Sequence, residues 1–353
     1  MPRNTPGPFA HSSGPRDAKI AIIGEAWGKD EDLVGRPFMG ASGQELTRML
    51  REAGIPRGEC FLTNVLALRP PGNNLELLCE TKAVVGKDYP FPPLSQGKYL
   101  GWEYLPEIQR LKEELSTVRP NLCIALGNTA TWALLGTRGI TSIRGVVANS
   151  TLLPGLKVLP TYHPSAILRN WSWRVIAIAD LMKAARESKT PELSRPARRV
   201  LVDPTLGEIH EWISTFLPSA PYLAVDTETA HRQIDMVGFA CSPTEALVVP
   251  FFNNQTYENY WPDEGDEVAA RKAVQTLLGS SVPKIFQNGL YDLQYFVREG
   301  FRVANVAEDT MLQHHSLYPE MQKSLGFLGS LYTNESSWKL MRRRGEDSLK
   351  KDE

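Results

Sequence analysis

Short apolar runs alternate with helix-like segments through the first half of the chain. The runs KIAIIG, CFLTN, LCIALG and KVLPTY predict four buried strands. Between them, apolar residues at helical spacing predict three helices. One ends at Gly54, one lies near residues 105–115, and one covers residues 128–135. Strands that alternate with helices form a parallel sheet with helices on both faces. We therefore expect an α/β domain over residues 18–184, after a flexible N-terminal arm at residues 1–17.

The alternation resumes in the second half, after a polar break. Residues 185–200 are charged and contain two prolines, which predicts a linker between two domains. Beyond it, the runs YLAVD, MVGFA, EALVVPF and KIF predict strands, and helical patterns cover residues 268–278 and 289–297. With 353 residues, the chain is long enough for two cores. A second α/β domain is expected over residues 201–353.

One segment interrupts the alternation in the first domain. Residues 72–101 are rich in proline and include the stretch KDYPFPPLSQGKY. A loop of this length is typically functional or an insertion. It is expected either to cover a pocket or to contact a partner.

Charge and cysteine usage narrow the class of protein. Residues 1–200 hold 26 Lys and Arg against 18 Asp and Glu, whereas residues 201–353 hold 13 against 22. A basic half suits a polyanion, and an acidic half suits metal ions or a basic partner. The four cysteines form no close pair, which argues against a disulfide framework and against a CxxC metal site. No apolar run is long enough to span a membrane, so we expect an intracellular protein without a membrane partner.

Polar clusters follow three of the predicted strands in the first half. GEAWG begins at Gly24, TN ends at Asn64 and is followed by RPPGN, and YHPS contains His163. The segment GRPFMG lies between GEAWG and TN. In an α/β sheet, ligands bind where parallel strands end at their carboxyl edge. The sequence therefore predicts one site built from these clusters.

The four motifs GEAWG, RPFMG, TNVLALRPPGN and HPSAILR, in this order, resemble the signature of the uracil-DNA glycosylase superfamily, especially its family-4-like branch. The resemblance covers roughly residues 19–183. It implies a parallel-sheet α/β/α fold and a glycosylase that flips uracil or a related base out of DNA and hydrolyses its N-glycosidic bond. The implied partner is DNA, single-stranded or containing uracil.

The resemblance also implies roles for individual residues. Asn64 would read the edge of the base, Glu25 would orient the attacking water, and His163 would stabilise the charge on the departing base. Phe38 would stack on the extruded ring, and Ile167 or Leu168 would wedge into the gap. The remaining residues expected to bind substrate, through the first loop or through the phosphates, are Gly24, Ala26, Gly40, Ser42, Ser165 and Arg169.

Two departures from the family pattern change these expectations. Family-4 enzymes hold an iron–sulfur cluster with four cysteines, but here the N-terminal arm has none and Leu68 stands before Arg69. We expect the cluster to be absent. Trp27 replaces the usual proline of the first loop and is expected to crowd it.

Carboxylates also follow two strands of the second half. Asp226 and Glu228 end the strand YLAVD on one face, and Asp292 lies in a helix after KIF. Such a set suits Mg²⁺ or Mn²⁺. The pattern DxE with NxxYD, which contains Tyr291, resembles the DEDD 3′–5′ exonuclease domain of phage family A DNA polymerases. The resemblance implies a ribonuclease-H-like fold with a mixed sheet and helices.

The exonuclease set is incomplete in this sequence. The third motif of that family, a carboxylate with an upstream Tyr or His, is expected after SSWKLM but does not appear. Asp309 is expected to anchor its helix rather than to bind a metal.

Two main functions therefore remain open, besides a weaker third, an independent nuclease, against which the incomplete carboxylate set argues. One is a DNA glycosylase acting in phage replication or repair, in the cytoplasm of the host cell. The other is a non-catalytic DNA-binding accessory or a split subunit, whose exonuclease half docks a separately encoded DNA polymerase.

Overall fold

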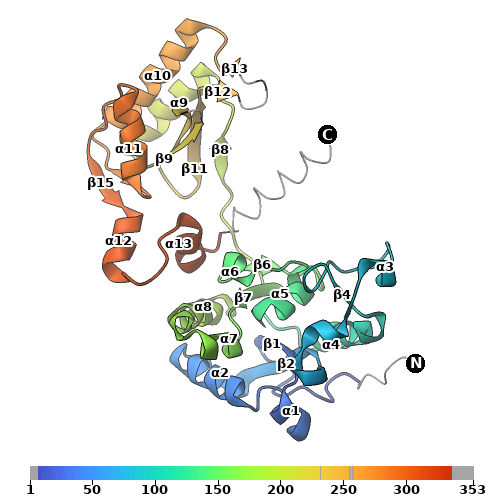
Figure 1. The fold of residues 1–353 in the computed structure, drawn as a ribbon. Helices are drawn as coiled ribbons and strands as arrows, with labels where there is room; N and C mark the ends of the chain where they lie inside the picture. The colour runs from blue at the N-terminus through green and yellow to red at the C-terminus, as the bar shows by residue number, and fades with distance from the viewer. Residues whose placement is uncertain (1–6, 231, 254–255, 257, 336–353) are drawn as a thin grey trace. The chain divides into compact units, whose positions relative to one another are not determined.

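The computed structural model describes residues 7–335, apart from residues 231, 254–255 and 257. The chain divides into two compact units (Figure 1). The first comprises Met1–Ser194 and Gly329–Glu353, and the second comprises Arg195–Leu328. Each unit contains its own sheet and its own hydrophobic core.

A five-stranded sheet in the order β2-β1-β5-β7-β6 forms the centre of the first unit. Neighbouring strands are parallel except for β6, which runs antiparallel to β7. The strands are β1 (Ile20–Ala26), β2 (Cys60–Leu66), β5 (Leu122–Leu126), β6 (Ala148–Asn149) and β7 (Lys157–Thr161). All four strands predicted from the apolar runs are present. The two-residue β6 was not predicted, because it is too short to show a period.

Helices cover both faces of this sheet. Residues of α4 and α5 join strand residues such as Ile23 and Phe61 in one core, and α2 packs against α8. The helices of this unit are α1 (Lys29–Val34), α2 (Ala41–Glu52), α3 (Lys82–Val85), α4 (Leu105–Val118), α5 (Gly127–Leu135), α6 (Ile140–Ile143), α7 (Pro164–Arg169) and α8 (Arg174–Glu187). The architecture is the predicted α/β/α arrangement.

The proline-rich insertion folds onto the core. It contains α3 and the antiparallel pair β3 (Cys79–Glu80) and β4 (Tyr99–Leu100). Leu78, Leu94 and Leu100 are buried in the same cluster as α4 and α5. The indole N–H of Trp132 on α5 donates a hydrogen bond to the carbonyl of Pro92 at 2.9 Å. The insertion is therefore part of the packed structure of the unit.

The second unit has a six-stranded mixed sheet in the order β15-β14-β9-β10-β11-β8. The pairs of β9 with β10 and of β10 with β11 are antiparallel, and the other pairs are parallel. The strands are β8 (Arg199–Leu201), β9 (Leu223–Ala230), β10 (Gln233–Ala240), β11 (Glu245–Pro250), β14 (Lys284–Phe286) and β15 (Val306–Asp309), and β12 (Phe252–Asn253) and β13 (Glu258–Asn259) form a separate pair. This is the expected mixed sheet.

Helices α9 (Leu206–Phe216), α10 (Glu264–Gly279) and α11 (Gly289–Arg298) accompany this sheet, followed by α12 (Thr310–Leu317) and α13 (Leu325–Tyr332). The core includes Trp212 on α9, Phe239 on β10 and Phe296 on α11. Among the described residues, no helix is both long enough and apolar enough to cross a membrane.

The segment between the domains is shorter than the linker predicted at residues 185–200. Helix α8 continues to Glu187 and β8 begins at Arg199. Helical spacing in α8 extends into the charged stretch, and β8 gains its strand structure by pairing with β11.

The first unit also includes residues that follow the second unit in sequence. The Lys183 ammonium donates to the carbonyls of Gly145 at 2.6 Å and Ser330 at 3.1 Å, and to that of Thr333. Burial lowers the pKa of Lys183 to about 8, against the pull of nearby Asp180. The expected boundary at residues 201–353 therefore differs from the compact second unit, which ends at Leu328.

Candidate active site

A cavity of about 730 Å³ lies at the carboxyl ends of the parallel strands of the first unit. Its lining includes nine of the residues predicted for this site: Glu25, Ala26, Phe38, Gly40, Ser42, Asn64, His163, Ser165 and Arg169. They meet because β1, β2 and β7 all run in one direction and end at the same edge of the sheet. Of the insertion at residues 72–101, only Asn73 lines the cavity, so the insertion does not cover it.

His163 follows β7 and precedes α7. Its Nδ1 accepts the backbone N–H of Ser165 at 3.2 Å and lies 2.8 Å from the Ser165 hydroxyl. Because a backbone N–H can only donate, Nδ1 is unprotonated, and the proton of the neutral imidazole is on Nε2. Withdrawal from water and the positive charge of Arg169 lower the pKa of His163 to about 4, although Glu31 acts in the opposite direction. At neutral pH, His163 is an uncharged hydrogen-bond donor in the cavity wall.

Glu25 ends β1 beside the cavity. Its Oε2 accepts the hydroxyl of Thr129 on α5 at 2.5 Å. Thr129 is buried, so the contact fixes one carboxylate oxygen of Glu25. The sequence analysis did not identify Thr129, because a threonine in a helix has no distinguishing pattern.

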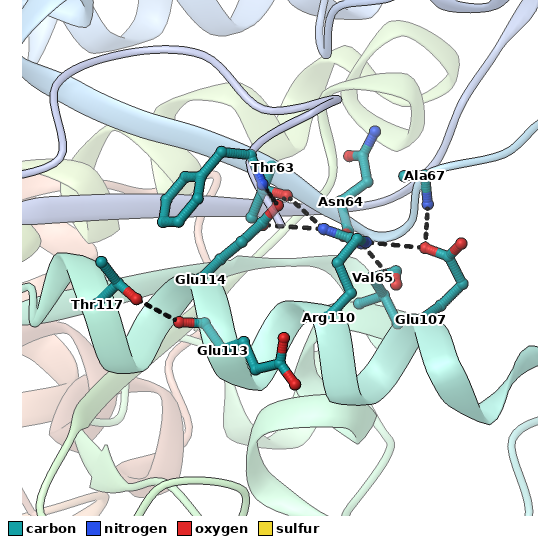
Figure 2. A network of polar contacts seen from close by, with 10 residues as sticks. Thr63, Asn64, Val65, Ala67, Glu107, Arg110, Glu113, Glu114 and Thr117 are labelled. Atoms are coloured by element: carbon teal, nitrogen blue, oxygen red, sulfur yellow. Dashed lines mark hydrogen bonds and ion pairs between the residues drawn. The ribbon is translucent and has the colours of Figure 1, made fainter. Parts of the chain in front are cut away.

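A buried ionic network on α4 contacts the backbone of Asn64 (Figure 2). Arg110 on α4 donates to the backbone carbonyl of Asn64 at 2.7 Å and to that of Val65 at 3.2 Å. The same guanidinium pairs with Glu107 and Glu114, each at 2.9 Å. In Figure 2 the amide of Asn64 lies on the side of β2 away from Arg110, as the alternation of a strand requires. The network therefore fixes the backbone while leaving the amide to the cavity.

The two carboxylates of this network also bind the rest of β2. Glu107 accepts the backbone N–H of Ala67 at 2.9 Å, and Glu114 accepts the Thr63 hydroxyl at 2.8 Å. Arg110, Glu107 and Glu114 are all at most 3% exposed. Buried charges are tolerated only when they are paired and hydrogen-bonded, and here each one has several partners.

Gly24 lies behind the cavity, between Asn64 and Phe38. An added Cβ on Gly24 would lie 2.2 Å from Oδ1 of Asn64 and 2.7 Å from Cζ of Phe38. Phe38 has φ 58°, a left-handed conformation that is uncommon for a bulky residue. Its carbonyl accepts Arg57 at 2.9 Å, and the backbone of Gly43 packs against it. Strain of this kind persists where surrounding contacts impose it, which is typical of functional sites.

Glu31 is a site residue that the sequence analysis missed. Its carboxylate lines the cavity and accepts the backbone N–H groups of Gly28, Met39 and Gly40 at 2.7–3.1 Å. Burial opposes ionisation of Glu31, but these hydrogen bonds hold its pKa below the ordinary value. Glu31 thus closes the loop that follows β1. Its spacing from Gly28, at which a glutamate commonly folds back on a helix start, was the available signal.

Three expected DNA contacts need correction. The N–H of Gly40 donates to Glu31 and that of Ser165 donates to His163, so neither amide is available to a phosphate. Ile167 is completely buried and cannot act as a wedge. Leu168 is 46% exposed and retains that predicted role.

Trp27, in the loop that follows β1, packs against the N-terminal arm. It is 7% exposed, and its ring packs edge-on against His11 at 4.6 Å. Its backbone N–H donates to the carbonyl of Leu68 at 3.0 Å. The indole therefore contacts the N-terminal arm while still lining one side of the cavity.

The second unit brings its predicted acidic residues near one another. Partial withdrawal from water, together with the charges of Asp292 and Glu228, raises the pKa of Asp226 to about 6. Asp292 on α11 accepts the N–H of Thr227 at 3.0 Å and its hydroxyl at 2.7 Å. Tyr291 lies with its hydroxyl 2.6 Å from that of Thr229.

These carboxylates do not yet form a metal centre. Within the described part of the chain, no group of three or more His, Cys, Asp or Glu residues converges closely enough to hold a metal ion. Oδ1 of Asp292 accepts both hydrogen bonds from Thr227, and these bonds leave Oδ2 open. Asp309 accepts the N–H groups of Gly289, Met311 and Leu312, so it anchors helix ends as expected. The stretch in which the third motif was expected, after residue 335, lies outside the described residues.

Comparisons with known proteins match each part of the chain to a family. Residues 11–186 match the Uracil DNA glycosylase superfamily. A type-4 uracil-DNA glycosylase of Thermotoga maritima is 35% identical over 48% of this chain and 78% of its own length. Type-4 uracil-DNA glycosylases of Archaeoglobus fulgidus and Sulfurisphaera tokodaii are 34% and 31% identical, over 44% and 54% of this chain and 69% and 76% of their own lengths.

The chain belongs to the uracil-DNA glycosylase superfamily. It also carries a 3′–5′ exonuclease domain, because residues 206–343 match that family. The glycosylase cavity therefore lies within the matched first part, and Asp226, Glu228 and Asp292 lie within the second.

This superfamily member does not offer the ligands of an iron–sulfur cluster. Its four cysteines lie at the start of β2, in β3, within β5 and in the second unit. Burial raises the pKa of Cys60 to about 12 and that of Cys79 to about 11, so both remain thiols at neutral pH. Leu68 packs against the hydrophobic core. These residues do not fit a cluster, and no part of the chemistry below depends on one.

Substitution of Gly24 tests the packing beneath the cavity. We expect Gly24→Ala to lower the free energy of unfolding by about 1–3 kcal/mol, because the new methyl group displaces Asn64 or Phe38. Chemical denaturation measures this change. Gly58→Ala is the matched control, since an added Cβ at Gly58 meets nothing within 4 Å. Equal stabilities of the two variants would contradict the close approach at Gly24.

Substitution of Asp226 tests the crowding of the carboxylates. Its pKa is raised from 3.8 to about 6 in the folded state, so stability falls as the pH rises through that range. We expect Asp226→Asn to raise the melting temperature at pH 8 in EDTA by a few degrees, corresponding to about 1 kcal/mol because water screens the site. The gain should vanish near pH 4. Asp203→Asn, at an exposed position, serves as the control, and a lowered midpoint for Asp226→Asn at pH 8 would refute the argument.

Proposed function

We propose that the first unit removes uracil from DNA by hydrolysing the bond between the base and its deoxyribose. The observation that carries the proposal is the hydrogen bond from Ser165 to Nδ1 of His163, which leaves the donor on Nε2. The relatives that support it are named type-4 uracil-DNA glycosylases. Five of the proposed groups line one cavity: Glu25, Phe38, Asn64, His163 and Arg169.

In this proposal the residues divide the work by their chemistry. The base leaves with the electrons of the broken bond, and Nε2–H of His163 donates a hydrogen bond to the oxygen on which the negative charge develops. Water adds to the sugar carbon, and Glu25, oriented by Thr129, holds that water. The proton that the water loses passes through solvent to the uracil anion. The Asn64 amide pairs with the edge of uracil, and Phe38 stacks on its ring. Arg169 contacts a phosphate, and Leu168 occupies the space of the flipped base.

A single oligonucleotide assay tests this proposal. An end-labelled single strand with one uracil is incubated in EDTA, and alkali then cleaves it at the abasic site. We expect one cleaved band, and a rate at least tenfold lower for His163→Ala and for Asn64→Ala. His210→Ala, at an exposed position in the second unit, is the matched control.

The pH dependence of the same rate tests the role of neutral His163. Because its pKa is about 4, the rate should show no loss as the pH falls from 8 to 5.5 and should fall only as Nδ1 becomes protonated. Full activity in both active-site variants, or no band with the parent chain, would eliminate the glycosylase assignment.

For the second unit we propose a role in holding DNA beside a separately encoded DNA polymerase, in phage replication or repair. The exonuclease family match favours a unit that receives a DNA strand. Within the described residues these carboxylates do not converge closely enough to hold a metal, which favours binding over cleavage. Mg²⁺ or Mn²⁺ would bind at Asp226, Glu228 and Asp292 if a partner completed the set.

Nuclease activity distinguishes binding from cleavage in the second unit. A labelled single strand without uracil, incubated with Mn²⁺, should be bound but not shortened. Shortening that disappears in Asp226→Ala would establish an exonuclease and contradict the binding role. Gel filtration with the polymerase should show a complex, and separate elution would refute the partnership.

A further inference from the structure

An exposed tryptophan, Trp171, lies in the sequence between two residues that line the cavity. Trp171 is 59% exposed in the short turn between α7 and α8. Residues on either side of it in the sequence, Arg169 and Trp173, line the cavity. Trp173 is itself stacked on Tyr162, with ring centroids 4.6 Å apart and planes 14° apart. Trp171 does not itself line the cavity, but it lies two residues from each of these cavity-lining side chains.

The indole of Trp171 is supported on one side. The guanidinium of Arg174 lies 5.1 Å from the ring centroid of Trp171. Arg174 is fixed in turn by Glu45 at 2.7 Å and by Glu52 at 2.6 and 2.9 Å. A cation held in this way steadies the ring through a cation–π contact. The rest of the ring remains open, so the arrangement presents a large apolar surface at little loss of side-chain freedom.

Two further apolar side chains close to Trp171 in the sequence are exposed. Leu168 and Val175 are 46% and 54% exposed, and they lie three and four residues from Trp171. Exposed apolar groups that adjoin a ligand cavity commonly take part in binding. Aromatic side chains of this kind stack on nucleobases, since every base has a flat apolar face.

We propose that Trp171 stacks on the base next to the flipped nucleotide, and that this contact makes single-stranded DNA the preferred substrate. The proposal rests on the proposed glycosylase function. In a duplex, the neighbouring base is already stacked and paired, so it gains less from the indole. In a single strand, that base is free to turn toward Trp171 while the flipped base enters the cavity.

The test removes the indole and the neighbouring base separately and then together. Uracil release is measured under single-turnover conditions on single strands with a normal neighbour or with an abasic residue on either side. Trp171→Ala should be about tenfold slower than the parent on the normal strand and less affected on a duplex. On the strand that lacks the stacking base, the two proteins should be equally fast. Trp171→Phe should restore most of the rate.

Trp102→Ala is the matched control, because Trp102 is 51% exposed in the same unit but has no cavity-lining residue near it in the sequence. It should cleave every strand as the parent does. Equal rates for Trp171→Ala and the parent on all strands would overturn the proposal. So would a tenfold loss that persists with both abasic neighbours, because the effect would then be structural.

Failure of the proposed function is distinguishable from failure of this inference. If the parent releases no uracil, fluorescence anisotropy with the same strands measures binding alone. About tenfold weaker binding by Trp171→Ala than by Trp102→Ala would uphold the stacking contact, and equal binding would reject it. Conversion of a dimer to a monomer by Trp171→Ala would assign the surface to a second copy of the chain and overturn the proposal.

Discussion

The active-site edge of the first unit depends on a single buried cation. Arg110 reaches two consecutive carbonyls near the end of β2 and two carboxylates of its own helix. The alternation of the strand turns the Thr63 hydroxyl toward this network and the Asn64 amide away from it. The backbone of the recognition residue is thus held by charge on one face of the sheet, while its side chain is free to act on the other.

On its other side, the Asn64 side chain is packed closely against Gly24. Gly24 provides no side chain where one would meet both Asn64 and Phe38. Charge beneath the strand and close packing above it act on the same residue from two directions. Such support is what keeps a hydrogen-bonding group in place when its partner is a base that must first leave the DNA stack.

The sequence predicted the site residues at the strand ends, but it did not predict the residues whose hydrogen bonds hold them in place. Glu25, Asn64 and His163 could be placed together because parallel strands share a carboxyl edge. Glu31 could not, because its three amide partners meet only after the loop has closed. The spacing of Glu107, Arg110 and Glu114 is that of ordinary surface pairs, and only burial distinguishes them. In the second unit, β9 and α11 were predicted, whereas the turn of Asp292 toward Thr227 depends on side-chain geometry that no pattern encodes.

The first unit contains residues from both sides of the second unit in the sequence, and this affects how it folds during synthesis. Lys183 finds two of its carbonyl acceptors at Ser330 and Thr333, which are translated only after Arg195–Leu328. Domains generally fold as their residues emerge, in order from the N-terminus. Until the second unit has been made, the Lys183 ammonium lacks two of its carbonyl acceptors. The order of synthesis therefore places the final closure of the first unit last.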